Sequence, residues 1–477
     1  MPRAVNPRAV LALLICGAAT LGLAQAPMQW SQAAPITLSV FIASAVAWTL
    51  MRWPDTPVAL AAALVLVALG VASPAVLYAS LGNSLVWLLI GAFLMAAVLQ
   101  QSGLVERWTL RAVAGAGSAS GLLWRLSAVI LATAFIVPST SGRAALLLPV
   151  FLALARSVGD RRIVRALALL FPSVILLSAC ASLLGAGAHL LAVDFMQRVG
   201  APALGYGTWM LWGLPFAVLS CIAATALIER LFLDRDTRQR PLHLPAAPDE
   251  PLTPNQKGAA AIAALTLAAW ASTGWHGVDA SLIAVFGSVA MTCRPLTGVD
   301  MKAALKKVEW NLVLFLAATL VMGEALSESG AARALADALL LALPPGTLTP
   351  AVGVSLAATV ALLSHLLIPS RTARAVVLLP TVALPLAAAG LNPVMLIFLC
   401  VLGSGFCQTL IVSAKPLAVF ARVDLPDGLD DPARPIDGQL ARLSLALLPV
   451  MLLLLGLMAF HVWPLLGLPL LAPARPA

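Results

Sequence analysis

The chain has 477 residues, of which 61% are hydrophobic and 10% are charged, and its formal net charge at neutral pH is +9. With a mean hydropathy of +0.98, it is too apolar for a soluble globular domain or a disordered chain, so lipid is its expected solvent. The basic residues lie in short loops rather than in one patch. That distribution fits the positive-inside rule of membrane proteins better than a nucleic-acid surface, and we expect no nucleic-acid partner.

Apolar runs close to the length that crosses a bilayer recur along the whole chain. We predict about 11 transmembrane helices, near residues 9–26, 36–52, 57–79, 85–101, 166–192, 209–228, 258–275, 280–293, 310–327, 392–412 and 438–461. The alternating pattern of a membrane β-barrel is missing from the sequence. The expected fold class is therefore an all-α polytopic membrane protein.

The first of these spans allows two interpretations. Arg3 and Arg8 precede it, and Ala24-Gln25-Ala26 resembles a signal-peptidase site. Because Pro27 follows that site directly and disfavours cleavage, we favour a retained membrane helix over a removed signal peptide.

Two further apolar stretches, 126–156 and 350–390, are each interrupted by a polar island, and the two islands repeat one another. Pro138-Ser139-Thr140-Ser141-Gly142-Arg143-Ala144, followed by Leu147-Leu148-Pro149, returns as Pro369-Ser370-Arg371-Thr372-Ala373-Arg374-Ala375, followed by Leu378-Leu379-Pro380. At about 1.5 Å per residue, most arms of these stretches are shorter than the roughly 30 Å apolar core of a bilayer. We therefore predict two re-entrant helical hairpins.

The duplication extends beyond the islands. Leu99-Gln100-Gln101-Ser102-Gly103 returns as Leu326-Ser327-Glu328-Ser329-Gly330, at nearly the same offset in sequence that separates the two islands. Arginines surround the first hairpin at positions Arg107, Arg111, Arg125, Arg156, Arg161, Arg162 and Arg165. Near the second we find Arg333 alone. The first hairpin should therefore open to the cytoplasm and the second to the outside, which is an inverted-topology repeat typical of secondary transporters.

These patterns predict five regions along the chain. They are an extra N-terminal membrane helix (1–35), a first repeat (36–228), a cytoplasmic linker (229–257), a second repeat (258–461) and a C-terminal tail (462–477). The first repeat contains the cytoplasm-facing hairpin, and the second contains the outward-facing one.

The islands have the chemistry of an anion site. Each breaks a helix at a proline and restarts it, which frees backbone N–H groups at the positive end of the helix dipole. The candidate substrate-binding residues of the two tips are Ser139, Thr140, Ser141, Arg143, Ser370, Arg371, Thr372 and Arg374. Alternatively the hydroxyls only cap helices and the arginines reach lipid headgroups. Two islands with arginine at one offset favour binding, because a charge inside a membrane is costly.

A long apolar span follows each hairpin, and the middle of each span is rich in small residues. The first, over 178–189, is rich in small residues, and the second holds Gly403-Ser404-Gly405 and then Ser413-Ala414-Lys415-Pro416. We expect both spans to unwind there, with Ser182 matching Ser413 at the offset of the islands, and we add Lys415 to the substrate-binding candidates. Close helix packing is the alternative use of small residues.

Glu324 and His365 are the candidates for proton coupling, because both are ionisable residues in predicted membrane segments. Glu324 could instead lie in water at a helix end. For His365, a hydrogen-bonded core histidine is the favoured alternative.

At the islands and breaks the chain resembles the divalent anion/sodium symporter family, which carries dicarboxylates, citrate and sulfate. That family has Ser-Asn-Thr at each hairpin tip, where this chain has Ser139-Thr140-Ser141 and Ser370-Arg371-Thr372. The resemblance implies a homodimer, sodium as coupling ion and no other metal or cofactor. It implies cation ligands at Ser139, Ser141, Gly185, Ser370, Thr372 and Ser413.

Both family asparagines are absent, and arginines lie at or near the tips instead. A guanidinium within a few ångströms of sodium would repel it by several kcal/mol at an effective dielectric of about 20. Our hypothesis is that arginines replace one or both sodium ions as fixed countercharges.

The sequence thus predicts a secondary active transporter of small divalent anions in a bacterial inner membrane. A sodium- or proton-coupled permease for sulfate, citrate or arsenite is the alternative within that class. A membrane enzyme is disfavoured because the sequence shows no catalytic cluster. A non-transporting sensor is also disfavoured, because the linker is too short for a signalling domain.

Overall fold

The computed structural model describes residues 7–24, 30–202, 204–242, 244, 250–342, 348–421 and 436–472. These residues form helices, with two isolated bridges, Ser118 to Pro241 and Leu391 to Leu471, as their only β pairing. Seven of the described helical segments are long and apolar enough to cross a membrane, and several shorter apolar helices accompany them. The all-α membrane fold class is therefore confirmed.

The helices of the N-terminal half are α1 (Pro7–Ala24), α2 (Ala33–Thr49), α3 (Asp55–Ala68), α4 (Pro74–Ser80), α5 (Ser84–Gln101), α6 (Leu104–Ala114), α7 (Ala119–Ala132), η1 (Thr133–Phe135), α8 (Thr140–Val158), α9 (Arg161–Ser178), η2 (Ala179–Ala181), η3 (Leu183–Gly185), α10 (Gly187–Arg198), α11 (Tyr206–Phe232) and α12 (Arg235–Gln239).

The helices of the C-terminal half are α13 (Pro254–Ala271), α14 (Thr273–His276), α15 (Ala280–Met291), α16 (Arg294–Thr297), α17 (Met301–Leu305), α18 (Trp310–Glu328), α19 (Ala331–Ala342), α20 (Pro350–Leu363), η4 (Ser364–Leu366), α21 (Arg371–Leu378), η5 (Leu379–Ala383), α22 (Leu384–Ala388), α23 (Pro393–Gly403), η6 (Ile411–Ser413), α24 (Lys415–Ala421), α25 (Ile436–Leu457), η7 (Met458–Val462) and α26 (Trp463–Leu465).

The structure differs from the predicted spans in two ways. The span expected at 57–79 is divided into α3 and α4, because Gly70 adopts a left-handed conformation and Ser73 caps a new helix. Two helices of more than ten residues, α6 and α19, lie outside the predicted spans. Charged residues such as Glu106 and Asp337 lower their hydropathy, so a search for apolar runs passes over them. Each begins directly after one copy of the repeated Ser-Gly pair, at Leu104 and at Ala331, which matches the duplication.

Both polar islands lie at the turn of a helix–turn–helix unit. The first unit runs from α7 through η1 to α8, and the second from α20 through η4 to α21 and α22. Ser139 and Ser370 cap α8 and α21 by accepting hydrogen bonds from the backbone N–H groups of Gly142 and Ala373. Each cap directly follows the proline of its island. The sequence therefore restarts a helix at the same point of each repeat.

The two spans that follow the hairpins are both broken near their small residues, as expected. In the first, α9 gives way to η2 and η3 before α10 begins, and in the second η6 lies between α23 and α24. Ala186 and Ala414 have nearly the same extended backbone, with φ of −158° and −157°. The matching backbone pairs Gly185, rather than Ser182, with Ser413. The expected pairing of Ser182 with Ser413 was therefore wrong, because the offset of the islands does not hold at the breaks.

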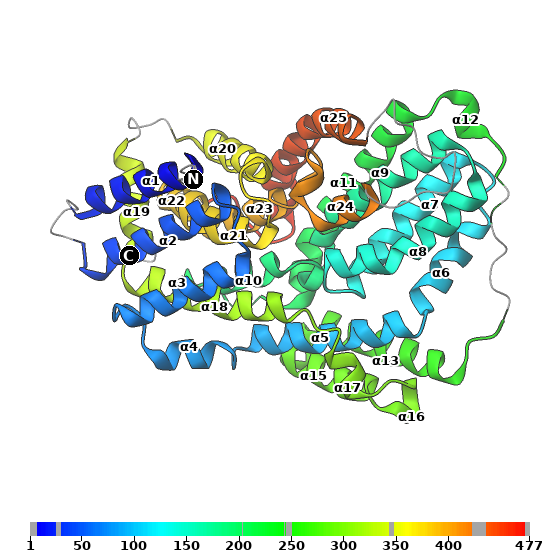
Figure 1. The fold of residues 1–477 in the computed structure, drawn as a ribbon, viewed down its shortest axis with the longest axis horizontal. Helices are drawn as coiled ribbons and strands as arrows, with labels where there is room; N and C mark the ends of the chain where they lie inside the picture. Colours follow the sequence, from blue (N-terminus) through cyan, green and yellow to red (C-terminus); the bar gives the residue numbers. More distant parts are fainter. Residues whose placement is uncertain are drawn as a thin grey trace, which may run out of the picture.

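Each hairpin packs against the broken span of the other repeat. Helix α10, from the first repeat, lies against α21 and α23, whereas α24, from the second repeat, lies against α8 and α9 (Figure 1). Phe420 of α24 sits between Phe151 and Phe171, with ring centroids 5.4 and 5.3 Å away. Because of this exchange, the two hairpin tips and the two breaks meet in the same region.

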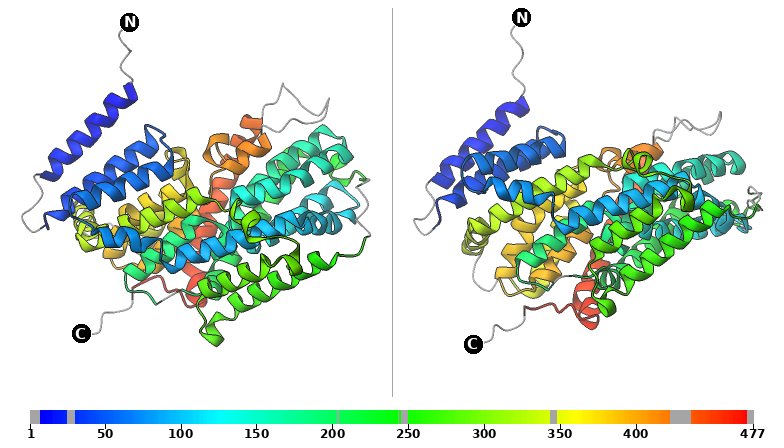
Figure 2. Two further views of the ribbon diagram at one scale, coloured as in Figure 1. Left: turned by 60° about the horizontal axis from the view of Figure 1, so that its bottom comes forward. Right: turned by 90° about the horizontal axis from the view of Figure 1, so that it is seen from below.

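The remaining long helices form a framework beside the hairpins. Helix α5 runs along α15, and α3 runs along α18, so each pair joins the two repeats (Figure 1). Gly91 allows the close approach of α5 to α15, since a Cβ there would lie 2.8 Å from the backbone of Ala284. Helix α1 packs on α2 at one edge of the molecule (Figure 2). The starts of α3 and α18 face the hairpin tips.

Candidate functional site

A polar cavity of about 380 Å³ lies where the tips and breaks meet. Both tips line it with hydroxyls, from Ser139, Thr140, Ser141, Ser370 and Thr372. The breaks contribute residues 186–187 and 412–416, and the framework contributes the starts of α3 and α18. The structure therefore brings together residues from all four broken segments and from two framework helices.

The cavity is lined by more cationic than anionic side chains. Four cations line it, from Arg52, Arg371, Arg374 and Lys415, and two anions, from Asp55 and Glu309. The lining therefore carries an excess of two positive charges, which favours a ligand with two negative charges.

Arg374 presents one edge of its guanidinium without a protein partner. Its side chain is fully buried, and Nη1 donates to the backbone carbonyl of Ile368 at 3.3 Å. Nε and Nη2 have no hydrogen-bond partner among the described residues, although the thiol of Cys407, a weak acceptor, lies beside the group. Nε and Nη2 are the two nitrogens that form a bidentate pair with a carboxylate.

Arg371 is also incompletely paired. Its Nη2 lies 3.0 Å from Nε2 of His189, and its Nε and Nη1 are buried without a partner in the described part of the chain. A buried guanidinium N–H without an acceptor costs free energy, so these groups call for an acceptor, which water or a ligand would supply.

Arg143 occupies a different environment from its counterpart Arg374. Its guanidinium donates four hydrogen bonds, to the hydroxyls of Thr133 and Ser178 and to the carbonyls of Ile130 and Ile175, at 2.5–3.0 Å. It is fully buried and is not among the residues that line the cavity. The structure thus separates Arg143 from the other candidates and uses it to join α7, α8 and α9.

The two tip serines each lie against a framework carboxylate. Ser139 donates a hydrogen bond of 2.6 Å to Glu309, which directly precedes α18. The hydroxyl of Ser370 interacts with Asp55, the first residue of α3. The carboxylate of Asp55 also interacts electrostatically with Lys415 and Arg374. Each hairpin tip is thereby connected to the framework through one acid.

Residues 45–403 match the family model described as the citrate transporter family. This chain belongs to that family. The match covers more than half of the sequence, and it confirms the resemblance to divalent anion carriers that the hairpin tips suggested.

Individual relatives support the same assignment. The chain is 22% identical to the sodium-dependent dicarboxylate transporter SdcS of Staphylococcus saprophyticus, over 80% of this chain and 79% of that protein. It is 23% identical to a membrane protein of Cupriavidus necator over 54% of this chain, a match that spans about half (52%) of that relative's length. It is 25% identical to an uncharacterized transporter of Mycobacterium bovis, over 64% of this chain and 70% of that protein.

A solved structure has the same fold. The YdaH transporter of Alcanivorax borkumensis superposes with a TM-score of 0.58 at 18% sequence identity, covering 84% of this chain and 89% of that one. At this identity the likeness establishes the fold alone.

Five of the six candidate cation ligands line the cavity. They are the tip residues Ser139, Ser141, Ser370 and Thr372, and Ser413 from the second break. Gly185 does not line it. A Cβ at Gly185 would lie 1.9 Å from the carbonyl oxygen of Ala179, so this glycine permits a tight turn. Among the described residues, no three His, Cys, Asp or Glu side chains form a metal-binding group.

Neither candidate for proton coupling lines the cavity. Glu324 lines a separate pocket with Arg198, between α4 and α18. His365 is 2% exposed, and its ring nitrogens contact the carbonyl of Leu362 and the hydroxyl of Thr409, each at 2.7 Å. Glu324 is therefore in a separate pocket, whereas His365 is in the turn of the second hairpin, where its carbonyl accepts a hydrogen bond from the hydroxyl of Ser413, a residue that lines the cavity.

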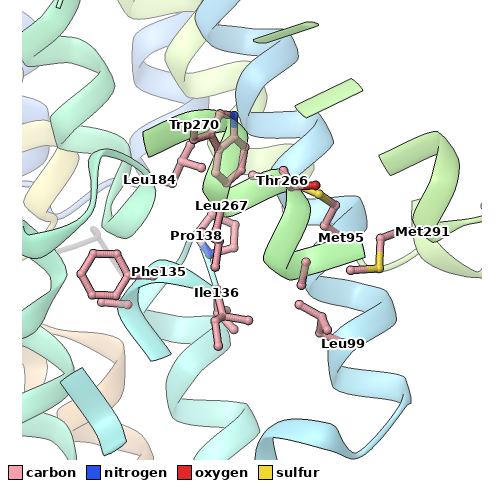
Figure 3. A pocket seen from close by; sticks show the side chains of 14 residues that line it. Met95, Leu99, Phe135, Ile136, Pro138, Leu184, Thr266, Leu267, Trp270 and Met291 are labelled. Carbon is pink, nitrogen blue, oxygen red and sulfur yellow. The ribbon is translucent and has the colours of Figure 1, made fainter. Parts of the chain in front are cut away.

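A second, apolar cavity of about 20 Å³ lies behind the first tip (Figure 3). Pro138 and Ile136 border it on one side, and Leu267 and Trp270 of α13 on another. Its one hydroxyl, from Thr266, is already bonded to the carbonyl of Ile262. This cavity offers no group that would bind an anion.

The sequence analysis missed four ionisable residues of the site region. Arg52, Asp55 and Glu309 are next to predicted spans, where charges are usually assigned to water-exposed loops, and His189 ends the small-residue stretch. Pro54 before Asp55 was a usable signal, because a proline followed by an acid marks a helix start.

Proposed function

We propose that this protein carries small divalent anions of the dicarboxylate type across the membrane by alternating access. The observation that carries the proposal is the set of buried guanidinium nitrogens on Arg371 and Arg374 that lack protein acceptors. A carboxylate would supply those acceptors, and the excess of two positive charges around the cavity matches a dianion. The cavity of about 380 Å³ has room for a ligand of this size.

The two hairpin tips differ in the cation that they suit. At the second tip, Arg371 and Arg374 stand among the hydroxyls where the family pattern implies sodium, and they act as fixed countercharges. The first tip has no such arginine, since Arg143 is engaged by α7 and α9. It has the carboxylate of Glu309 beside Ser139 instead. Arginine therefore replaces sodium at the second tip only, and the first tip keeps a negative group that suits one cation.

The packing of each hairpin against a helix of the other repeat suggests which parts of the protein move together. Helix α10 is packed on the second hairpin and α24 on the first, so the hairpins and broken spans form one body. Helices α3, α5, α15 and α18 form the framework against which this body would move in a membrane-embedded homodimer. Ser139 with Glu309 and Ser370 with Asp55 are polar contacts between the two bodies, as is Arg198 of α10 with the carbonyl of Leu320 in α18.

Uptake of labelled succinate into proteoliposomes tests the proposal. The purified protein is assayed with and without an inward sodium gradient, and with and without internal succinate. We expect uptake in at least one condition, with competition by malate and citrate. Uptake that needs two or more sodium ions would contradict the replacement of sodium at the second tip. No uptake of succinate under any condition would contradict the proposed substrate class.

A further inference from the structure

His189 is the histidine at the break of the first repeat, and the anion site described above does not yet use it. It lies on α10, has no exposed surface, and is 182 residues away in sequence from Arg371, its partner in the second hairpin. Its ring packs against the indole of Trp209, with centroids 4.8 Å apart and the two planes tilted by 33°. Trp209 is itself held by a hydrogen bond to the carbonyl of Cys180. The ring is therefore fixed before any ligand arrives.

The hydrogen bonds of His189 determine its tautomer. Nδ1 lies 2.9 Å from the backbone carbonyl oxygen of Ser182, and a carbonyl oxygen only accepts, so Nδ1 carries the proton. Nε2 then has a lone pair and accepts from Nη2 of Arg371, 3.0 Å away. The imidazole is thus a neutral acceptor for the guanidinium, and it is aimed by the backbone of the first break.

Arg371 is held from its other side by the second break. A Cβ on Gly405 would lie 2.7 Å from Nη2 of Arg371, so the guanidinium rests on a backbone without a side chain. Between Gly405 and His189 this long side chain has little rotational freedom, and Nε and Nη1 remain without acceptors among the described residues.

We propose that His189 is a positioning residue, which holds Arg371 in the orientation that binds a carboxylate. The inference rests on the proposed function. It adds that anion affinity at the second hairpin depends on an acceptor supplied by the first repeat. Holding Arg371 before the ligand arrives lowers the ordering cost of binding, so the effect falls on affinity rather than on the rate of translocation.

The test is a double-mutant cycle with succinate as the probe. His189→Phe keeps an aromatic ring on Trp209 but removes the acceptor, and we expect the Kd for succinate to rise about tenfold with little change in maximal uptake. His189→Gln, whose Oε1 can replace Nε2, should recover part of that loss. In an Arg371→Gln background, His189→Phe should have no further effect on Kd. His276→Phe, the same change at an exposed helix end far from Arg371, should leave Kd unaltered.

Gly405→Ala provides an independent check, because it displaces Arg371 without touching His189, and it should also raise the Kd. Equal Kd values for the wild type and His189→Phe, or additive effects of His189→Phe and Arg371→Gln, would overturn the inference while leaving the proposed function intact. Failure of the unmodified protein to bind succinate would instead overturn the proposed function, and with it the role of His189 in anion affinity.

Discussion

Arg143 and Arg374 occupy equivalent positions in the two repeats, but Arg143 donates four hydrogen bonds to protein groups and Arg374 donates one to Ile368. The difference lies in what surrounds them. Ile175 and Ser178, at the end of α9, bond Arg143. In the second repeat, no hydroxyl among the described residues accepts a hydrogen bond from Arg374. The two arginines therefore differ: Arg143 joins helices of the first repeat, and Arg374 is the one for which we propose a role in anion binding.

Replacing these two arginines should affect different properties, anion binding for Arg374 and stability for Arg143. Arg374→Gln should raise the Kd for succinate roughly ten- to a hundredfold, because hydrogen bonds to charged groups contribute about 1.5–3 kcal/mol. Its thermal stability should change little. Arg143→Met should lower the free energy of unfolding by about 3 kcal/mol, since the buried carbonyls of Ile130 and Ile175 would lose their donor. Binding measurements and thermal unfolding in detergent distinguish the two. Similar effects of both substitutions on both measurements would refute the division of roles.

Arg371→Asn should make transport more dependent on sodium. The substitution restores the family's residue at the second tip and removes a positive charge from among the hydroxyls of Ser370 and Thr372. The measurement is succinate uptake against sodium concentration in proteoliposomes. We expect a steeper sodium dependence together with weaker binding in the absence of sodium. A folded, active variant whose sodium dependence is unchanged would contradict the countercharge hypothesis.

Glu309→Gln should strengthen anion binding and weaken any stimulation by sodium. It increases the positive excess around the cavity from two charges to three, and a unit charge roughly 10 Å away contributes about 1–2 kcal/mol at an effective dielectric near 20. Succinate should therefore bind about tenfold more tightly at low salt. Glu324→Gln, the same change in a separate pocket, is the matched control. If both variants behave alike, Glu309 does not act on the anion site.

Gly213→Ala should destabilise the first broken span. A Cβ at Gly213 would lie 2.2 Å from the carbonyl oxygen of Cys180, so α11 would have to move away from the break. We expect a loss of about 1–3 kcal/mol in unfolding free energy. Uptake should also fall, because Trp209 of α11 bonds the carbonyl of Cys180 and packs against His189. Gly456→Ala in α25 meets no atom within 4 Å and should be neutral or slightly stabilising. Equal stability of the two variants would refute this account.

Much of the fold could be predicted from the sequence because lipid imposes strict conditions on it. Long apolar runs must become helices, so the spans near 85–101, 209–228 and 310–327 correspond to α5, α11 and α18. The islands at Pro138 and Pro369 were also predictable, since proline followed by hydroxyl residues breaks a helix and caps the next one. The amphipathic helices α6 and α19 were missed because length and hydropathy alone do not detect them.

The sequence by itself determined the membrane class, the duplication and the positions of both helix restarts, because these depend on local composition and on residues close together in the chain. Only the tertiary structure decided which charged residues line the cavity. It engaged Arg143 in the first repeat, left Arg374 open, and brought Asp55, Glu309 and His189 to the hairpin tips. Those outcomes depend on the packing of each hairpin against the half-helix of the opposite repeat. Contacts between residues such as His189 and Arg371, 182 positions apart, leave no pattern in a single sequence.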